Sequence, residues 1–390
     1  MTPQLWLGYL SSYLQKHGYN VLLIDGLRDR LENTEILDIL KRENIKVAGI
    51  TCLSAYYNEV VLLSRYLKEN GIKVIVGGVH PTFMPYQTLL ESKADYAICG
   101  EGEIAMLALA KNNFNYILHN GLGRIKGVYA LSDLQDETTP FEKADIVEKL
   151  DDIPYPDWRQ MNLNSYPLAP HGAFAKYFPI GIIFSSRGCP YSCKFCASPN
   201  FYDKKVRFRS AENIIGEIKY LIENFKVKEI QFEDDNITFK RDHIEKICNF
   251  IIDNKIKIAL SCPNGIRAGR VDEDLIKLMK KAGFYYCAIG VESANKDILR
   301  NIDKKESIET IINSIKLIAK HGIVTQGFFI FGLPGETKET IEETINFTLN
   351  TDLERAQFLI LDVLPGCDLW NDLDGEFVSN FSKKSYKEPE

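Results

Sequence analysis

The sequence predicts an α/β protein with two parts, a doubly wound parallel-sheet domain and a second domain of repeated strand–helix pairs. Strand-like apolar runs alternate with helix-period segments in both halves of the 390-residue chain. The links between them are short, as they are in βα units. An acidic stretch followed by a proline- and tyrosine-rich stretch separates the halves. We therefore predict a first domain at 1–132, a linker at 133–180 and a second domain at 181–390 that ends in a short tail.

The first domain opens with a helix-period segment that stops at Gly18, and a short β-rich run follows at 20–25. Further strands are predicted at 46–53, 73–78 and 95–100, with helices at 34–44, 58–71 and 86–94. This alternation predicts a parallel sheet covered by helices on both faces. A doubly wound domain normally opens with its central strand, whereas this chain opens with a helix. We expect the first strand to be missing, either because the N-terminus is truncated or because another segment fills its place.

The second domain contains a longer series of the same kind. Its strands are predicted at 181–186, 229–234, 258–263, 285–293, 326–332 and 356–365. Helices are predicted between them at 211–225, 241–254, 272–282, 307–321 and 337–350. Six strands, each but the last followed by a helix, suit a partial βα barrel or an open sheet.

Composition and charge exclude several classes of protein. A net charge of −6 argues against a general nucleic-acid binder, because phosphate contacts need a basic face. No apolar run approaches the roughly 18 residues of a membrane span, and the start of the chain lacks the features of a secretory signal. We therefore expect a cytoplasmic protein. In a reducing compartment its nine cysteines are expected to be ligands, nucleophiles or core residues rather than disulfides.

Three of the cysteines form a closely spaced group directly after the first strand of the second domain. Cys189, Cys193 and Cys196 have the spacing C-x3-C-x2-C, and Gly188 and Pro190 favour a tight loop in which three thiolates can converge. Three thiolates suit a four-iron cluster with one iron left open. A structural zinc site is the main alternative, but it would want a fourth Cys or His nearby. The simplest interpretation of the other strand and helix cysteines is that they fill the core; they are Cys52, Cys99, Cys248, Cys262 and Cys287.

The cysteine triad, with Phe195 before its third member, resembles the radical S-adenosylmethionine (SAM) superfamily over roughly residues 180–366. Further family motifs follow in order: FEDDNIT, NGIR, GVES and GFFIFGLPGET. A Pro365-Gly366 pair resembles the family's closing element, with Cys367 where Thr is usual. The resemblance implies a partial (βα)6 barrel that binds SAM and a 4Fe-4S cluster. The implied SAM-binding residues are Phe195, Glu233, Asp234, Asp235, Asn236, Arg267, Glu292, Ser293, Ile330 and Gly332.

Each of these motifs has an implied part in holding SAM. Residues 233–236 stand where the family holds the methionine amino group, and carboxylates suit an ammonium. Arg267 is implied as a partner of the SAM carboxylate, and Glu292 and Ser293 as partners of the ribose hydroxyls. The strand that contains Ile330 and Gly332 would contact the adenine, with Glu336 in register. All of them lie at the C-terminal ends of predicted strands, where parallel βα folds place ligands.

The first domain resembles the cobalamin-binding domain that precedes the radical SAM domain in one subfamily, a flavodoxin-like, Rossmann-type fold. The resemblance is carried by LGYLSSYLQKHGYNVLLIDG, VIVGGVHPTFMP and YAICGEGE. It implies cobalamin contacts from Ser54, Gly77, Gly78, His80, Thr82, Gly100 and Glu101. Cobalamin domains that ligate cobalt use Asp-x-His-x-x-Gly, but here the corresponding place reads Asp25-Gly26-Leu27-Arg28. We therefore expect cobalt to be bound without a protein imidazole below it.

The resemblance implies a cobalamin-dependent C-methyltransferase, in which one SAM supplies a 5′-deoxyadenosyl radical and a second SAM recharges methylcobalamin. It implies a small-molecule or natural-product substrate and an external electron donor such as flavodoxin or ferredoxin. The nearest alternative is an oxidative cyclase of the anaerobic porphyrin type. Two others are a radical SAM enzyme whose first domain is a degenerate scaffold without cobalamin, and a non-enzymatic iron–sulfur or zinc protein. The sequence does not identify the substrate.

Overall fold

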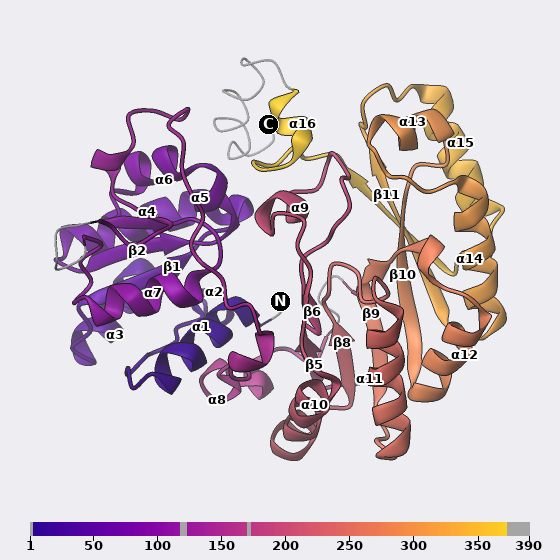
Figure 1. Ribbon diagram of the computed structural model, residues 1–390, viewed down its shortest axis with the longest axis horizontal. Coiled ribbons are helices and arrows are strands. Elements are labelled where there is room, and N and C mark those ends of the chain that lie inside the picture. The colour runs from indigo at the N-terminus through magenta and orange to yellow at the C-terminus, as the bar shows by residue number, and fades with distance from the viewer. Residues whose placement is uncertain (1–2, 118–122, 170–172, 373–390) are drawn as a thin grey trace. The chain divides into compact units, whose positions relative to one another are not determined.

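The computed structural model describes residues 3–117, 123–169 and 173–372 and divides into two compact units (Figure 1). The N-terminal unit is built from the described parts of Gln4–Glu148, Asp152–Asn162 and Leu364–Glu390. The C-terminal unit is built from those of Met1–Pro3, Lys149–Asp151 and Leu163–Val363. The short tail that the sequence predicts at the end of the second domain falls mostly outside the described residues, which end at 372.

The N-terminal unit has one sheet with the strand order β1-β2-β3-β4. The first three strands are parallel and confirm three of the predicted strands; they are β1 Val47–Thr51, β2 Lys73–Gly77 and β3 Tyr96–Ile98. β4, Val128–Tyr129, pairs antiparallel with β3 and was not predicted. Within the described residues, no strand precedes Val47.

Helices cover both faces of this sheet, which confirms the doubly wound architecture. Val74 and Val76 face one core, and Ile75, which lies between them in β2, faces the other. The first core is completed by α3 Asn33–Arg42, α4 Tyr57–Glu69 and α6 Pro85–Ser92. The second is completed by α1 Leu5–Lys16 and α7 Gly102–Lys111.

The prediction of a strand at 20–25 was wrong, because this extended segment pairs with no strand of the described residues. Its backbone is instead hydrogen-bonded by a side chain. Gln160 Nε2 donates to the Val21 carbonyl, and Gln160 Oε1 accepts from the Leu23 N–H, each at 2.9 Å. One amide side chain thus makes the pair of bonds that a neighbouring strand would make.

The C-terminal unit contains a six-stranded, fully parallel sheet. Its strands follow one another in chain order: β5 Ile180–Ile183, β8 Glu229–Phe232, β9 Ala259–Ile266, β10 Phe284–Glu292, β11 Val324–Phe331 and β12 Arg355–Ile360. Right-handed crossovers between strands in consecutive order place every connecting helix on the same face. These helices are α10 Ala211–Phe225, α11 Arg241–Asp253, α12 Glu273–Ala282, α14 Ile308–Lys320 and α15 Lys338–Leu349 (Figure 1). The predicted partial (βα)6 barrel is confirmed.

Short elements complete both units. The minor strands β6 Ser186–Arg187 and β7 Arg207–Phe208 pair antiparallel beside the cysteine loop. The short α-helices are α2 Gly26–Asp29, α5 Val79–Phe83, α8 Trp158–Met161, α9 Ser198–Phe201, α13 Lys296–Asn301 and α16 Asp368–Asn371. The 3₁₀ turns are η1 Ser54–Tyr56, η2 Leu131–Asp133, η3 Leu150–Asp152, η4 Leu163–Ser165 and η5 Ala268–Arg270.

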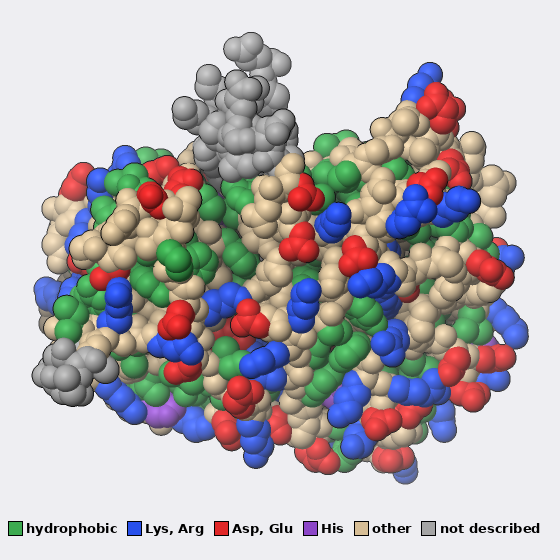
Figure 2. Space-filling view, turned by 45° about the horizontal axis from the view of Figure 1, so that its top comes forward, with side chains coloured by type: hydrophobic (Ala, Val, Ile, Leu, Met, Phe, Trp, Pro, Cys, Tyr) green, Lys and Arg blue, Asp and Glu red, His purple; other side chains and the backbone are tan. Residues whose placement is uncertain are grey.

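Acidic and basic side chains are interspersed on the face shown in Figure 2. No helix among the described residues is both long enough and apolar enough to cross a membrane. The cysteines predicted to fill the core are all buried, which confirms that prediction; they are Cys52, Cys99, Cys248, Cys262 and Cys287.

Candidate functional site

The cysteine loop leaves the short strand β6 through Gly188, a residue with φ +99°. A Cβ atom built on Gly188 would lie 2.1 Å from the carbonyl oxygen of Lys205, so the turn has room for glycine alone. The Cys196 N–H donates to the Cys193 carbonyl at 3.0 Å and closes the second half of the loop. The segment is therefore a tight loop, as the sequence predicted.

The three thiols of the loop are partly exposed and lie close enough to influence one another. Burial raises the pKa of Cys189 to about 11 and that of Cys196 to about 12, and the neighbouring thiols add to both shifts. In the described residues, no three His, Cys, Asp or Glu side chains are arranged to hold a single metal ion. Three thiols in one tight loop are the ligand type that a four-iron cluster with one open iron takes.

Asp235 fastens both ends of this loop. Its carboxylate accepts a hydrogen bond from Ser198 Oγ at 2.8 Å, just after the third cysteine. It also accepts one from the backbone N–H of Gly188, just before the first. Asp235 therefore positions the loop, and this role is additional to the contact with SAM that the sequence predicts.

Asp234 is buried, and its carboxylate accepts hydrogen bonds from two serines between β5 and the start of β6. Its Oδ1 accepts from Ser185 Oγ at 2.7 Å and from Ser186 Oγ at 2.5 Å, and its Oδ2 accepts from the Ser185 N–H at 3.0 Å. His243 Nε2 lies 3.0 Å from Ser185 Oγ. Because burial lowers the pKa of His243 to about 4, its ring is neutral at pH 7. The Ser185 hydroxyl donates its proton to Asp234, so its oxygen accepts from His243, and Nε2 is the protonated nitrogen of the neutral ring.

Glu233 and Asn236 keep polar atoms that could bind a ligand. Burial is the largest effect on the pKa of Glu233 and raises it. The hydrogen bond from Asn264 lowers the pKa, the charge of Asp234 raises it, and the net value is about 7. Asn236 is buried, and its Oδ1 accepts from Thr238 Oγ1 at 3.0 Å. Its Nδ2 has no hydrogen-bond partner. A buried amide donor without a partner costs free energy, and this fits a position that a polar ligand completes.

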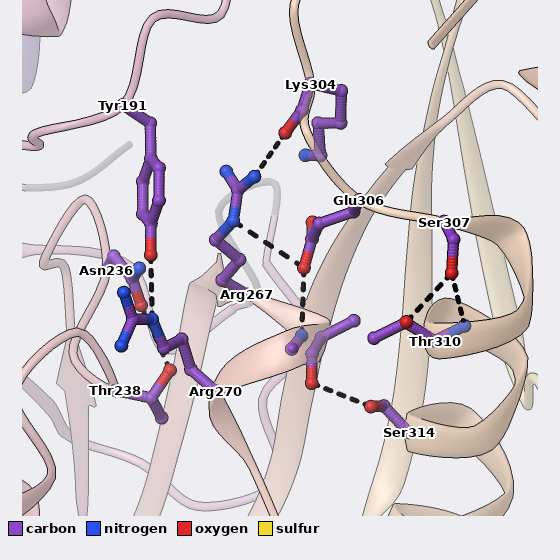
Figure 3. Close-up of polar contacts among 12 residues, drawn as sticks. Tyr191, Asn236, Thr238, Arg267, Arg270, Lys304, Glu306, Ser307, Thr310 and Ser314 are labelled. Atoms are coloured by element: carbon purple, nitrogen blue, oxygen red, sulfur yellow. Dashed lines mark hydrogen bonds and ion pairs between the residues drawn. The ribbon is translucent and has the colours of Figure 1, made fainter. Parts of the chain in front are cut away.

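Arg267, at the end of β9, is packed against the cysteine loop by Tyr191 (Figure 3). The guanidinium carbon lies 3.6 Å from the centroid of the Tyr191 ring. From the same turn, Arg270 Nε donates to the Tyr191 hydroxyl at 2.9 Å. The sequence analysis missed Tyr191, although its place between the first two cysteines was a signal that it could contact whatever lies beside them.

Glu292, at the end of β10, forms a buried ion pair. Lys304 Nζ lies 2.8 Å from Glu292 Oε1, and both side chains are almost fully buried. Burial lowers the pKa of Lys304, but Glu292, Cys193 and Glu306 outweigh it, so the net direction is a raised pKa. Sequence reasoning missed Lys304, which stands in an ordinary polar stretch after α13. Ser293 is buried and accepts from the Asn295 N–H at 3.2 Å.

The remaining predicted SAM residues lie along the loop and β11. Phe195 is partly exposed within the loop, and Ile330 is buried near the end of β11. Gly332 has φ +91°, and its N–H donates to Glu336 Oε2 at 2.5 Å. Gly366 lies in the N-terminal unit, where a Cβ would come within 2.3 Å of the Phe83 ring.

The predicted cobalamin residues gather at the C-terminal edge of the other sheet. Thr82 joins two of its loops, because Thr82 Oγ1 donates to the Gly78 carbonyl at 2.7 Å and accepts from the Gly100 N–H at 2.8 Å. Gly78 has φ +112°, and a Cβ there would lie 2.8 Å from the Cys52 carbonyl oxygen. Gly77 ends β2, and Glu101 is buried directly before α7. The loops after three neighbouring strands are thus brought together.

His80 is buried at this edge with one ring nitrogen in use. Its Nδ1 lies 3.0 Å from Ser54 Oγ, and its ring packs on Tyr57 with a centroid distance of 4.2 Å. Its Nε2 is buried without a hydrogen-bond partner. Burial lowers the pKa of His80 to about 4, so the ring is neutral at pH 7. A neutral imidazole with a spare nitrogen suits a polar ligand at this edge.

The segment at the position of the cobalt-ligating motif forms the start of α2. Asp25 is buried and its side chain accepts a hydrogen bond from the Arg28 N–H at 3.0 Å, so it caps the helix. The segment carries no histidine.

Two family models match the chain. The Radical SAM superfamily model matches residues 183–348, and the B12 binding domain model matches residues 1–110. Each match covers part of the unit that contains the corresponding predicted residues.

Relatives share both parts of the chain. An uncharacterized methyltransferase from Pyrococcus horikoshii is 32% identical over 373 residues, which are 94% of this chain and 78% of the relative. The anaerobic magnesium-protoporphyrin IX monomethyl ester cyclase of Rubrivivax gelatinosus is 28% identical over 395 residues, 99% of this chain and 69% of that one. Among solved structures, the radical SAM methyltransferase TsrM of Kitasatospora setae, with cobalamin and a 4Fe-4S cluster bound, has a TM-score of 0.76. The match covers 95% of this chain and 71% of TsrM at 17% identity, a likeness of fold.

Proposed function

Because the chain belongs to the radical SAM superfamily, in the branch with an N-terminal cobalamin-binding domain, we propose that it transfers a methyl group to an unactivated carbon of a small molecule. The protein is a radical SAM enzyme of a methyltransferase family, and its cofactors are SAM, a 4Fe-4S cluster and cobalamin. The observation that carries the proposal is the joint presence of the cysteine loop and the cobalamin-binding edge in one chain. The carbon acceptor and the roles of single residues are our inference.

The cysteine loop would hold the cluster through Cys189, Cys193 and Cys196. Because burial raises the pKa of these thiols, iron uptake must displace their protons, and cluster binding is expected to strengthen with pH. Asp235 would keep the loop closed by its bonds to both ends. When bound, the cluster supplies the electron that cleaves SAM, and cobalamin supplies the methyl group.

SAM would lie across the C-terminal strand ends of the barrel. Glu233 and Asn236 provide a carboxyl and a spare amide for the methionine end, and Arg267 provides a positive charge for its carboxylate. Glu292 and Ser293 would meet the ribose, and Phe195, Ile330 and Gly332 the adenine. Asp234 would contribute by fixing the strand end on which the loop begins.

Cobalamin would bind along the edge formed by Ser54, Gly77, Gly78, His80, Thr82, Gly100 and Glu101. The glycines allow the backbone to approach a bulky ligand, and Thr82 holds the two loops at a fixed separation. The spare Nε2 of His80 offers a hydrogen bond to a polar part of the ligand. An external electron donor such as flavodoxin or ferredoxin and a cytoplasmic location complete the proposal.

Analysis of the products formed from SAM tests this function. The reconstituted, cobalamin-loaded protein would be incubated anaerobically with SAM, a reductant and a panel of candidate acceptors. Methyl transfer predicts both 5′-deoxyadenosine and S-adenosylhomocysteine, and the methyl carbon of labelled SAM in the acceptor. Oxidative cyclisation, which the similarity to the Rubrivivax cyclase keeps as a second candidate, predicts 5′-deoxyadenosine without S-adenosylhomocysteine. Neither product from a protein with a full complement of cofactors would refute both functions.

A further inference from the structure

Glu292 has a backbone conformation that a residue with a side chain rarely adopts. Its φ is +66°, and the Ser293 N–H donates to the Val291 carbonyl at 2.9 Å across it. This is a γ-turn with a positive φ, the rarer and strained of the two kinds. It lies where the pairing of β10 with β11 shifts register. Strained backbone of this kind persists only when surrounding contacts hold it, and such residues cluster at ligand-binding sites.

Lys304 holds the side chain of this strained residue. Its Nζ donates to Glu292 Oε1 at 2.8 Å, and only 9% of the lysine side chain and 8% of the glutamate side chain are exposed. The carboxylate is folded back over its own strand, because a Cβ atom built on Gly290 would lie 2.4 Å from Glu292 Oε1 and 2.8 Å from Lys304 Nζ. Gly290 therefore leaves the space in which the two charges meet.

The backbone of Lys304 is fixed as well as its side chain. Its N–H donates to the Leu299 carbonyl at 3.0 Å, and its carbonyl accepts from Arg267 Nη2 (Figure 3). Two residues earlier, the Ile302 carbonyl accepts at 3.0 Å from the N–H of Lys194 in the cysteine loop. The ammonium group is therefore presented from a fixed point of the barrel, as a residue that orients a ligand-binding group must be.

We propose that Lys304 is a positioning residue that holds the Glu292 carboxylate for the vicinal hydroxyls of the SAM ribose. The inference rests on the proposed function, in which Glu292 meets the ribose. The ion pair occupies Oε1, and Oε2 accepts no hydrogen bond from the residues that the structure describes. That second oxygen can accept from a hydroxyl group. A carboxylate already fixed in place loses less freedom when the ligand binds, so the lysine strengthens binding through Glu292.

Binding of SAM and of its 2′,3′-dideoxy analogue, which lacks both ribose hydroxyls, tests this role. Each would be titrated calorimetrically into the reconstituted, cobalamin-loaded protein without a reductant, so that neither is cleaved. The wild type should bind SAM about tenfold more tightly than the analogue, the effect of one hydrogen bond to a charged group. Lys304→Met should bind SAM about tenfold more weakly and the analogue as the wild type does. The preference for the hydroxyls is then lost.

Lys305→Met is the matched control. Lys305 is the next residue, but it is exposed and pairs with Asp303, so this variant should keep the preference of the wild type. Lys304→Gln keeps an N–H donor without the charge and should retain part of the preference. It also provides the test if Lys304→Met does not fold or assemble. Adding Lys304→Met to Glu292→Gln should cause no further loss of preference, because the lysine acts through the carboxylate.

The outcomes distinguish the inference from the function on which it rests. Lys304→Met and Lys304→Gln that weaken both ligands equally, or neither, would overturn the inference alone. A lysine that contacts another part of SAM, or that only supports the fold, does not discriminate between the two ligands. A wild-type protein that binds SAM and the dideoxy analogue equally would overturn the assignment of Glu292 to the ribose, and the inference with it.

Discussion

Asp235 accepts a hydrogen bond from Ser198 Oγ at 2.8 Å, and this bond ties the far end of the cysteine loop to the end of β8. The near end is tied to the same carboxylate through the Gly188 N–H. A side chain that is not expected to ligate iron therefore holds both ends of the segment that does.

We predict that Asp235→Ala loosens the cluster without removing a ligand. Loss of two hydrogen bonds to a carboxylate should let iron pass to a chelator at least about tenfold faster, at about 1.5 kcal/mol or more per bond. Iron release can be followed by absorbance under anaerobic conditions. Asp253→Ala, at the exposed end of α11, is the matched control and should release iron at the wild-type rate. Equal rates in the two variants would contradict the prediction.

The raised pKa of Glu233 predicts that SAM binding depends on pH. Glu233 loses its proton near pH 7, and an ammonium partner favours the charged form, so SAM should bind about five- to tenfold more weakly at pH 6 than at pH 7.5. Calorimetric titration of the reconstituted protein measures this change. Glu233→Gln should bind weakly with little pH dependence in this range, and the same dependence in both proteins would count against the assignment.

The same shift has the opposite consequence for SAM-free stability. Between pH about 4.5 and 7 the folded chain keeps a proton on Glu233 that the unfolded chain has released. The stability of the C-terminal unit should therefore decrease as the pH rises through this window. Hydrogen exchange of strand β8 at several pH values measures this change, and Glu233→Gln should remove its contribution.

Because Lys304 and Glu292 form a buried ion pair, we predict that removing one charge lowers the stability much more than removing both. Lys304→Met leaves a carboxylate buried without its counter-ion, which costs about 3–5 kcal/mol. Lys304→Met combined with Glu292→Gln removes both charges and should restore most of this loss. Hydrogen exchange of β10 in the SAM-free protein reports the free energy of opening. Equal losses in the single and double variants would show that the pair is not coupled.

Glu229 anchors the chain that enters β5. It is buried at the start of β8 and accepts from the Tyr285 hydroxyl at 2.8 Å and from the backbone N–H groups of Lys176 and Tyr177 at 3.2 Å. Glu229→Gln turns an acceptor into a partial donor, so it should cost about 2–4 kcal/mol and expose Lys176 to trypsin. Tyr285→Phe removes the bond to Glu229 and the bond that the Tyr285 hydroxyl accepts from the Lys176 N–H, but it keeps the carboxylate, so cleavage at Lys176 should be slower than in Glu229→Gln. Wild-type resistance at Lys176 in Glu229→Gln would refute this anchoring role.

We predict that Thr82→Val weakens cobalamin binding and that the same substitution of the nearby Thr88 does not. Thr82→Val removes the link between the loops of Gly78 and Gly100 and leaves a buried N–H without a partner, so hydroxocobalamin should bind about fivefold or more weakly. Thr88→Val is the matched control, because Thr88 is buried and bonds only within its helix, to the Met84 carbonyl. Absorbance titration compares the variants, and equal weakening in both would contradict the assignment.

The sequence predicted the regular elements best where local signals agree with the packing. The bounds of α10 match because Ser210 caps its first turn and Lys226 ends it in the left-handed conformation. The run at 20–25 has the residue types of a strand, but a strand also needs a neighbour to pair with. Here Gln160, far along the chain, supplies the hydrogen bonds instead, and no local pattern contains that information.

The sequence predicted the site residues that belong to a recognisable motif. It did not predict those that reach the site only because the chain folds. The three cysteines stand close together in the sequence, and their loop is also close in space. Glu306 reaches Arg267 because the neighbouring strands β9 and β10 end side by side, and Lys304 reaches Glu292 because the chain returns past the end of β10 after α13. Spacing along the chain cannot reveal such pairs, since lysine and glutamate are mostly solvated surface residues.

Iron content after anaerobic reconstitution tests the central claim most directly. We predict a brown protein with about four irons per chain in the wild type, and little iron in Cys193→Ala, which lacks one of the three thiolates. Cys248→Ala, which removes a buried cysteine of α11, should keep the full iron content. A colourless wild-type protein that binds one zinc, or a Cys193→Ala variant that retains four irons, would contradict the account.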